Sequence, residues 1–462
     1  MTRRWWLTTA GALALWPVAA GAQPVGPPPL TLTDAIQLAV QHYPALRESR
    51  ARAQAAEEGI AVARAAYLPR LDLLWQENRA THNNVFGLLL PQAAVPGISG
   101  PVLGTRSFDS VWGSAAGGLL SWEAVDFGQR KAAVDSARAQ STQARARDEL
   151  TTLDLTAAAA DAFLSALASD EAVRAAQANV DRLQVLAQSV RTLVANQLRP
   201  GVDESRANAE LAIAKNQLSL AMQTSELARA TLGGLIGRTA NRVDLVSGRL
   251  AMLPSPDPAP AADVGSHPAV RAELAQVEVV ASRERALAHA YVPRVTLQAA
   301  LFGRGSGADV PGQARIGDGL WLRVPNWAVG ASVTFPAFDI FPLRARRRVE
   351  RQNLLAEKAR YDQTVEDLTT QESRVRALTK AAVEIAANTP VERQAATDAE
   401  SRARARYANG LANITEVADA TRLLAQAESD DALARLGVWR ALLATAQVHG
   451  DLKPFIDQVI KR

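Results

Sequence analysis

Small apolar residues recur every seven positions in two long stretches of the chain. The recurring alanines stand at Ala207, Ala214, Ala221 and Ala228 in the first stretch and at Ala420, Ala427, Ala434 and Ala441 in the second. A seven-residue repeat keeps one stripe of a helix facing a partner helix, and small side chains let the two backbones approach closely. The two sets are offset by 420 − 207 = 213 residues, and 441 − 228 gives the same offset. The pattern therefore predicts one helical hairpin that occurs twice.

Both predicted hairpins contain a very long helix. The helical pattern runs over residues 128–196 in the first copy and over residues 343–409 in the second, and the chain turns at tips near 197–203 and 407–416. At 1.5 Å per residue each helix is about 100 Å long, which is too long for a compact domain. Pro390 predicts a kink or a local unwinding, because proline lacks the amide hydrogen and clashes with the preceding turn.

Two segments in each copy change to the alternating pattern of a β-strand. Leu71, Leu73 and Trp75 occupy one face of the first such segment, within a predicted hairpin at about 70–122, and the second copy repeats the pattern at about 294–336. Strands of roughly 9–11 residues with one apolar face are typical of outer-membrane barrels. For any one strand taken alone, the edge of a soluble sheet packed on helices is an equal alternative.

Four strands from one chain cannot form a closed membrane barrel. The smallest membrane barrels have about eight strands, and an open edge in lipid leaves backbone groups unpaired. Several chains must therefore share one barrel. Two chains would give eight strands and an interior nearly filled by side chains, whereas three chains would give twelve strands and room for a passage.

The N-terminus has the pattern of a secretory signal peptide. Arg3 and Arg4 precede an apolar run at 5–20, and Ala20-Gly21-Ala22 supplies a cleavage site. The segment also matches a twin-arginine signal, but we favour export of the unfolded chain because an outer-membrane strand protein crosses the periplasm unfolded. No other apolar run reaches the length of a membrane helix, so we expect no helical span in the mature chain.

The duplication and the composition at its borders divide the chain into five predicted parts. These are a signal peptide at 1–22, a first repeat at 23–250, a Pro-rich connector at 251–262, a second repeat at 263–450 and a C-terminal tail at 451–462. The connector holds four prolines at alternate positions and is expected to be extended.

Charge and composition point away from nucleic acid binding and from catalysis. The net charge of +4 is too small to indicate a nucleic acid partner. The five histidines lack metal-ligand spacing, and we find no catalytic residues, metal site or cofactor-binding loop, so we expect no enzyme and no cofactor. The absence of cysteine fits an exported protein without disulfides. A basic run at 346–348 is interpreted as a solvated face near the barrel.

The order and duplication of these motifs resemble the TolC family of outer-membrane efflux ducts over essentially the whole mature sequence. The residues that carry the resemblance are Leu32-Thr33-Asp34-Ala35-Ile36, Tyr43-Pro44, Tyr67-Leu68-Pro69-Arg70 with Tyr291-Val292-Pro293-Arg294, Val125-Asp126-Phe127-Gly128, Phe338-Asp339 and the segment from Tyr407 to Ala420.

The resemblance implies a mainly α fold with β strands, built from two internal repeats. It implies a homotrimer in which a twelve-strand barrel in outer-membrane lipid, four strands per chain, continues into an α-helical barrel that crosses the periplasm. It also implies two partners, a periplasmic adaptor (membrane fusion) protein and an inner-membrane pump of the RND or ABC type.

The resemblance further implies a gate at the periplasmic tips. Tyr407 matches the tip tyrosine that holds such tunnels closed, and Asp203 matches the acid that it meets. Glu416 and Asp419 match the acids that line the tunnel mouth, although two solvated surface acids are the alternative for such a pair. The basic residue often found two positions after the second glycine is replaced by Ala412.

Adaptor docking is expected at Gly410, Leu411 and Leu198, because the turns of the family usually carry Gly-Leu. The first turn departs from this pattern. Gln197 stands where the glycine is expected, and Gly201 lies four residues further along.

Three classes of function are open to this sequence: an export duct, a structural protein and an enzyme. The favoured function is the exit duct of a tripartite efflux system, and the duct of a type I protein secretion system shares its architecture. A structural trimeric coiled coil at the cell surface would need neither the strand hairpins nor the tip motif. An enzyme is the third alternative, and no site supports it.

Overall fold

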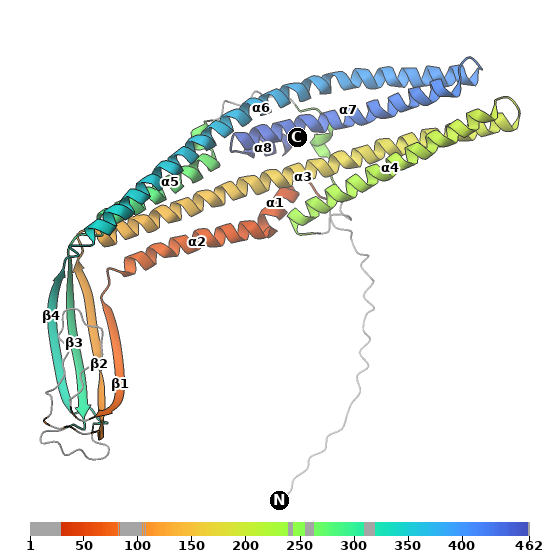
Figure 1. The fold of residues 1–462 in the computed structure, drawn as a ribbon. Helices are drawn as coiled ribbons and strands as arrows, with labels where there is room; N and C mark the ends of the chain where they lie inside the picture. Colours follow the sequence, from red (N-terminus) through yellow and green to blue (C-terminus); the bar gives the residue numbers. More distant parts are fainter. Residues whose placement is uncertain are drawn as a thin grey trace, which may run out of the picture.

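The protein is elongated, with a β-sheet at one end and two helical turns at the other (Figure 1). The computed structural model describes residues 29–81, 83, 104, 106, 108–238, 244–254, 263–308 and 319–460. The predicted signal peptide at 1–22 and most of the predicted connector at 251–262 lie outside the described residues, and the predicted domain boundaries stay predictions.

Eight α-helices form in the described part of the chain. They are α1 (Leu32–His42), α2 (Pro44–Ala65), α3 (Gln129–Ala195), α4 (Gly201–Ile236), α5 (Pro268–Ala288), α6 (Ile340–Ala408), α7 (Ile414–Val448) and α8 (Lys453–Ile460), with short 3-10 helices η2 (Gly248–Ala251) and η3 (Val264–Ser266). The two long helices have 67 and 69 residues, as the pattern predicted. Of the two outcomes predicted at Pro390, a kink or a local unwinding, the unwinding does not occur, because α6 stays α-helical through this position. Packing along α7 holds the helix on both sides of the lost hydrogen bond.

The helices lie side by side in one layer, and the helices that pack against α3 and α6 change halfway along their length. Near the sheet, α3 packs between α2 and α5, and α5 packs on α6. Toward the tips, α3 packs on α4 and α7, and α7 packs on α6. The largest core lies at the changeover, where Phe163 of α3, Trp439 of α7 and Phe455 of α8 are fully or almost fully buried. The segment expected to be a C-terminal tail therefore contributes a packed helix.

The expectation that no apolar run beyond the signal peptide reaches the length of a membrane helix is wrong for α3. Within the described residues, α3 contains a window that is long and apolar enough to cross a membrane by length and composition. More than half of this window, 56%, is buried inside the protein. Its apolar character is that of a core helix, and it reflects the alanine-rich stretch that packs in the central core.

The four predicted strands are present and form one antiparallel sheet. They are β1 (Arg70–Thr81), β2 (Ser110–Val125), β3 (Arg294–Ser306) and β4 (Val324–Thr334), in the order β1-β2-β3-β4. Each copy contributes one hairpin, and β2 pairs with β3 to join the two copies. This leaves β1 and β4 as the outer strands of the sheet.

One face of the sheet is apolar and exposed. Leu73, Gly118, Leu301 and Trp327 are paired in one row across the four strands. The side chains of Leu73, Leu301 and Trp327 are 79%, 70% and 76% exposed. The opposite face carries polar side chains such as Gln298, which donates to the Ser121 hydroxyl at 3.1 Å. The same face also carries a small buried apolar cluster that includes Leu119 and Phe302. The exposed apolar face is the feature typical of a strand in an outer-membrane barrel.

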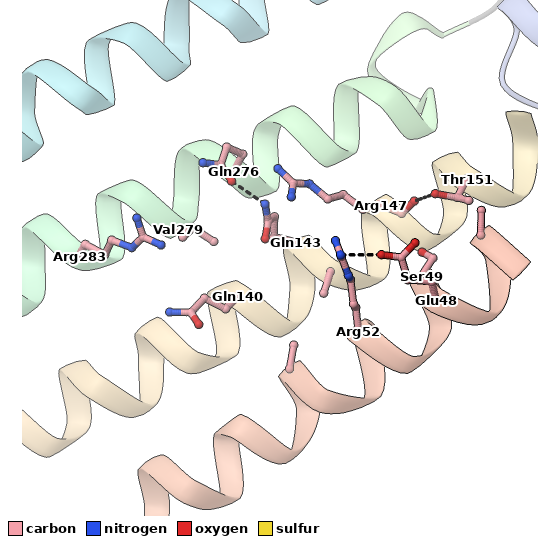
Figure 2. A pocket seen from close by; sticks show the side chains of 13 residues that line it. Glu48, Ser49, Arg52, Gln140, Gln143, Arg147, Thr151, Gln276, Val279 and Arg283 are labelled. Carbon is pink, nitrogen blue, oxygen red and sulfur yellow. Dashed lines mark hydrogen bonds and ion pairs between the residues drawn. The ribbon is translucent and has the colours of Figure 1, made fainter.

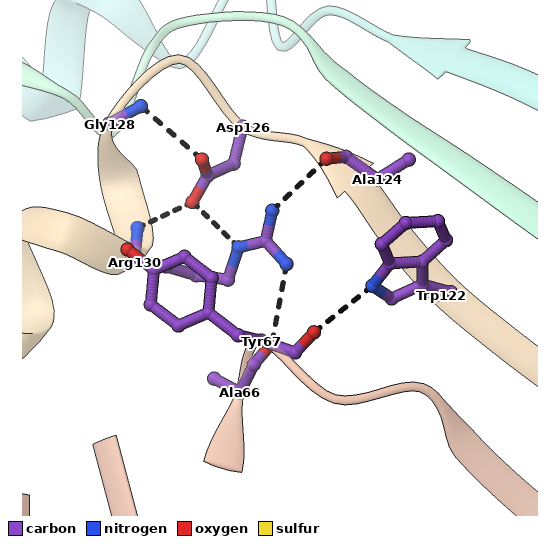
Figure 3. Close-up of polar contacts among 7 residues, drawn as sticks. All are labelled: Ala66, Tyr67, Trp122, Ala124, Asp126, Gly128 and Arg130. Atoms are coloured by element: carbon purple, nitrogen blue, oxygen red, sulfur yellow. Dashed lines mark hydrogen bonds and ion pairs between the residues drawn. The ribbon is translucent and has the colours of Figure 1, made fainter. Parts of the chain in front are cut away.

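A buried ion pair fixes the start of α3 to the sheet (Figure 3). The Arg130 guanidinium lies 3.0 Å from the Asp126 carboxylate, donates to the Ala66 and Ala124 carbonyls, and stacks over the Tyr67 ring at 4.7 Å. The second copy has no such clamp, because Leu343 stands at the position equivalent to Arg130, 130 + 213 = 343. This clamp therefore anchors the junction of strand and helix in the first copy.

The two tip turns have the same backbone geometry. The amide of Leu198 donates to the Leu193 carbonyl at 2.9 Å, and that of Leu411 donates to the Arg406 carbonyl at 2.8 Å. Gln197 adopts a φ of 60°, close to the 74° of Gly410. The absence of glycine at the first turn therefore leaves its shape unchanged, at a cost of about 1 kcal/mol for a side chain in the left-handed region.

Replacing Gln197 with glycine should raise the stability of the protein by up to about 1 kcal/mol, because the left-handed strain is removed. Gly410→Ala should lower it by a similar amount. Gln197→Ala is the matched control and should bring little gain, since alanine keeps the Cβ. The midpoint of thermal unfolding measures all three. An unchanged or lower midpoint for Gln197→Gly would contradict the assignment of strain.

His267 ties the start of α5 to the end of α7. Its Nδ1 accepts a hydrogen bond from the Ala269 amide at 3.0 Å, so Nε2 carries the proton and donates to the Gln447 carbonyl at 3.2 Å. Burial lowers the pKa of His267, the Arg271 charge lowers it further, and the Gln447 carbonyl and Asp154 oppose this shift. Burial raises the pKa of the nearby Asp154 above 3.8. Protonation of Asp154 therefore favours the folded state, whereas protonation of His267 disfavours it, and Asp154 titrates at lower pH.

Acid should weaken this connection. The folded pKa of His267 lies below the ordinary 6.5, so its contribution is present above pH 6.5 and is lost as the pH falls through the folded pKa. Stability measured from about pH 7 to pH 5 should fall less in His267→Asn, because asparagine also caps the helix but does not titrate. Equal pH dependence in both proteins would show that His267 is not the group that titrates.

Candidate gate at the helical tips

A buried hydrogen bond joins the two tips. Tyr407 lies in the last turn of α6 with only 4% of its surface exposed, and Asp203 lies in the first turn of α4. The Tyr407 hydroxyl donates to Asp203 Oδ2 at 3.2 Å. The structure thus brings together two residues of the predicted gate, which are 204 positions apart in the chain.

Arg199 adds two further contacts to this pair. Its Nη2 donates to the Tyr407 carbonyl at 2.5 Å, and its guanidinium lies 4.4 Å from the centre of the Tyr407 ring. Arg199 was not among the predicted gate residues, although Ala412 stands where a basic side chain was expected. The repeat offset could have found it, because 412 − 199 = 213. The first copy therefore supplies the positive charge that the second copy lacks.

The Tyr407 phenol stays protonated in this setting. Burial raises its pKa, the Asp203 charge and the hydrogen bond to Asp203 raise it further, and Arg199 opposes them, giving a pKa of about 12. Its hydrogen bond therefore persists below the ordinary tyrosine pKa of 10.0 and is lost as the pH rises toward the folded value.

An apolar cluster supports the tyrosine. Its buried members come from all four helices of the two hairpins and include Val190, Ala207, Ala403 and Val417. Packed side chains hold the ring in place, so the hydrogen bond to Asp203 requires little further ordering.

The two predicted mouth acids lie nearby, each beside an arginine. Glu416 in the first turn of α7 lies 3.5 Å from Arg406, and Asp419 lies 3.4 Å from Arg422. Arg422 also donates to both carboxylate oxygens of Glu210 on α4. The acids are exposed, and no contact within the described residues joins them to Tyr407 or Asp203. The arginine partners were missed because they lie on other turns or helices.

The three predicted docking residues lie at the extreme ends of the hairpins. Leu198 and Leu411 are 68% and 71% exposed. A Cβ added to Gly410 would meet only Arg199, at 4.0 Å. The two turns therefore offer an apolar side chain each, in the same backbone frame.

Ion pairs connect the hairpin of one copy to that of the other. Arg182 of α3 binds Glu428 of α7 through two bonds of 3.1 and 2.7 Å. Arg440 of α7 binds Asp161 of α3 at 2.8 Å. The contact between hairpins therefore combines these ion pairs with apolar clusters that α3 and α7 share.

In the part of the chain that the structure describes, no group of three or more His, Asp or Glu side chains could hold a metal ion.

The family model of outer membrane efflux proteins matches residues 35–238 and 264–451 of this chain. A relative of known function, the pyoverdine export outer membrane protein OpmQ of Pseudomonas aeruginosa, is 27% identical over 320 residues. That alignment covers 68% of this chain and 63% of OpmQ, so the chain spans less than two thirds of this relative's length.

Solved structures share the fold. The outer-membrane channel OprN is 20% identical with a TM-score of 0.71, and the alignment covers 91% of this chain and 89% of OprN. The open state of the MtrE outer membrane channel of Neisseria gonorrhoeae is 20% identical with a TM-score of 0.73, again covering 91% and 89%.

These matches confirm the predicted fold, with its two repeats, helical hairpins and four strands. TolC-like channels form trimers and lie in the outer membrane with a long periplasmic helical portion. The chain therefore belongs to the family of outer membrane efflux proteins, which are channels and not enzymes.

Proposed function

We propose that the protein is the exit duct of a tripartite efflux system and that its helical tips form the periplasmic gate. The contact of Tyr407 with Asp203 and Arg199 carries this proposal, because it closes the two hairpins on each other at the end remote from the sheet. The apolar sheet face at the opposite end suits outer-membrane lipid. Substrates would pass through without chemistry, driven by a partner.

A homotrimer explains the surfaces that one chain leaves open. Exposed apolar residues recur every seven positions on two helices. They are Ile213, Leu220 and Leu227 on α4 and Leu378 and Ile385 on α6. With the offset of 213, α6 corresponds to α3 and α4 to α7. The contact of α3 with α7 within one chain therefore has a counterpart between α6 and α4 of neighbouring chains. Three copies would also close twelve strands into one barrel.

Opening of the gate would separate the two hairpins. Each protomer would lose the Tyr407 hydrogen bond and both Arg199 contacts. Each of the two hydrogen bonds contributes about 1 kcal/mol and the cation–π contact a similar amount, so the loss is about 3 kcal/mol per protomer and about 9 kcal/mol for three. This energy is small enough for a bound partner to supply.

Glu416 and Asp419 would line the mouth in three copies. Because Arg406 and Arg422 lie beside them, their field is weaker than that of bare carboxylates. These two ion pairs lie within the second hairpin and would persist when the hairpins separate, whereas the bonds from Arg422 to Glu210 of α4 would break and leave Glu210 unpaired.

The partners are a periplasmic adaptor protein at the tips and an inner-membrane pump of the RND or ABC type. Leu198 and Leu411 offer apolar contacts, and the shared geometry of Gln197 and Gly410 allows an adaptor hairpin to dock at either turn. A type I protein secretion duct would use the same architecture. The relative named for pyoverdine export favours a small substrate.

The protein should be an obligate trimer in detergent, because open strand edges and the apolar stripes need a neighbour. Leu220→Glu should reduce the trimer yield. Met222→Glu is the control, since Met222 is also exposed on α4 but lies on the opposite side of the helix. Mass measurement of the purified protein tests this. A stable parent monomer that conducts in bilayers would end the proposal.

Removing the tip contacts should open the channel. Arg199→Gln combined with Tyr407→Phe should raise the conductance of the trimer in planar bilayers, because the closed state loses its hydrogen bonds and its cation–π contact. Arg206→Gln provides the control on α4, as an exposed arginine without an ion pair in the described part of the chain. A double variant that forms trimers but conducts like the parent would show that these contacts do not close the gate.

A further inference from the structure

The open face of the helical layer can be identified on α3. Arg147, Thr151, Asp154 and Asp161 follow one another at spacings of four, three and seven, which places them on one stripe of the helix. Phe163 points the other way and is buried in the central core with residues of α1 and α8. A duct cannot carry a packed core across its passage. If the proposed function holds, the stripe with Arg147 therefore faces the passage.

A cavity of about 650 Å³ lies on this face, between α2, α3 and α5 (Figure 2). Three arginines from three different helices line it, Arg52 from α2, Arg147 from α3 and Arg283 from α5. In Figure 2 the side chains of Arg52 and Arg147 extend toward the space around Gln143, and Arg283 approaches it from the other end. The sequence gives no sign of this cluster, because its members are up to 231 positions apart, 283 − 52 = 231.

The positive charge of the cavity is only partly balanced. Arg52 binds Glu48 at 2.5 Å, whereas Arg147 and Arg283 make no ion pair within the described residues. One carboxylate therefore faces three guanidinium groups. The groove on the opposite face of the same helices differs, because both of its arginines, Arg138 and Arg285, bind acids of their own helix.

Neutral side chains hold the floor of the cavity. The amides of Gln143 on α3 and Gln276 on α5 meet at 2.5 Å, and Gln276 also donates to Glu357 of α6. The Arg147 guanidinium lies beside the neutral Gln143 amide.

We propose that this cavity is a binding station for anionic substrates on the wall of the passage. This proposal rests on the proposed duct. It assigns the substrate class as small molecules with several carboxylate, phosphate or sulfonate groups. A guanidinium group presents two parallel N–H donors to such a group. Three protomers would place three stations, with nine arginines in all, around the passage.

The station suits transport because its sites are open and repeated. Conduction requires binding that is favourable enough for entry and weak enough for release, and several equivalent sites allow both. Glu48 moderates the charge of each station. The arginines raise the local concentration of anions beyond the acidic mouth.

Inorganic triphosphate is the probe for the experiment, with calorimetry on the detergent-purified trimer. Arg147→Gln combined with Arg283→Gln should weaken triphosphate binding by about tenfold or more, because two charge-assisted contacts are lost. Glu48→Gln should strengthen binding, an effect that a purely structural role would not produce. Arg47→Gln with Arg50→Gln removes the same charge from the other side of α2 and should bind like the parent.

Conductance in planar bilayers separates the station from the duct. Triphosphate should reduce the current of the parent trimer, and the Arg147 and Arg283 double variant should resist this block. Equal binding in parent and double variant would overturn the station while leaving the duct intact. Triphosphate that binds without reducing the current would place the cavity away from the passage and also overturn the proposal. A trimer that conducts no ions under any condition would instead contradict the proposed function.

Discussion

The architecture of the whole molecule depends on the unpaired backbone groups along the outer strands β1 and β4. A four-stranded sheet in lipid leaves a row of N–H and C=O groups without partners on each outer strand, and each such group is costly in hydrocarbon. Only neighbouring chains can pair them. When the strands of neighbouring chains close into a barrel, the helices that leave the sheet must also form a closed ring. The long helices α3 and α6 then form part of the wall of a helical tunnel. The exposed stripes on α4 and α6 follow from the same constraint.

The two copies have diverged where the fold needs an asymmetric contact. The first copy keeps the Asp126 and Arg130 clamp at the sheet and carries Arg199 at the tip, whereas the second carries Tyr407. A gate needs two different surfaces that meet, and a duplicated hairpin can provide them only after its copies differ. Arg199 and Ala412 illustrate this division, because one copy retains the charge and the other has lost it.

Charge is arranged unevenly along the proposed passage. At the mouth, Glu416 and Asp419 are matched by arginines, so acids and bases are interspersed. In the half near the sheet, Arg147 and Arg283 make no ion pair within the described residues. Ion pairs such as Arg182 with Glu428 join the hairpins, beside the apolar clusters that the two hairpins share.

The sequence by itself determined the helices, the strands and the duplication, because these depend on periods of seven and two and on a constant offset that can be counted along the chain. It also brought Tyr407 and Asp203 into one hypothesis, but only through a family resemblance. The tertiary structure alone decided that Arg199 stacks on Tyr407, 208 residues away, and that three arginines share one cavity. It also decided that Gln197 adopts a left-handed conformation, which local preference disfavours and closure of the hairpin imposes. Such contacts depend on how helices pack across the layer, and that packing leaves no period in the sequence.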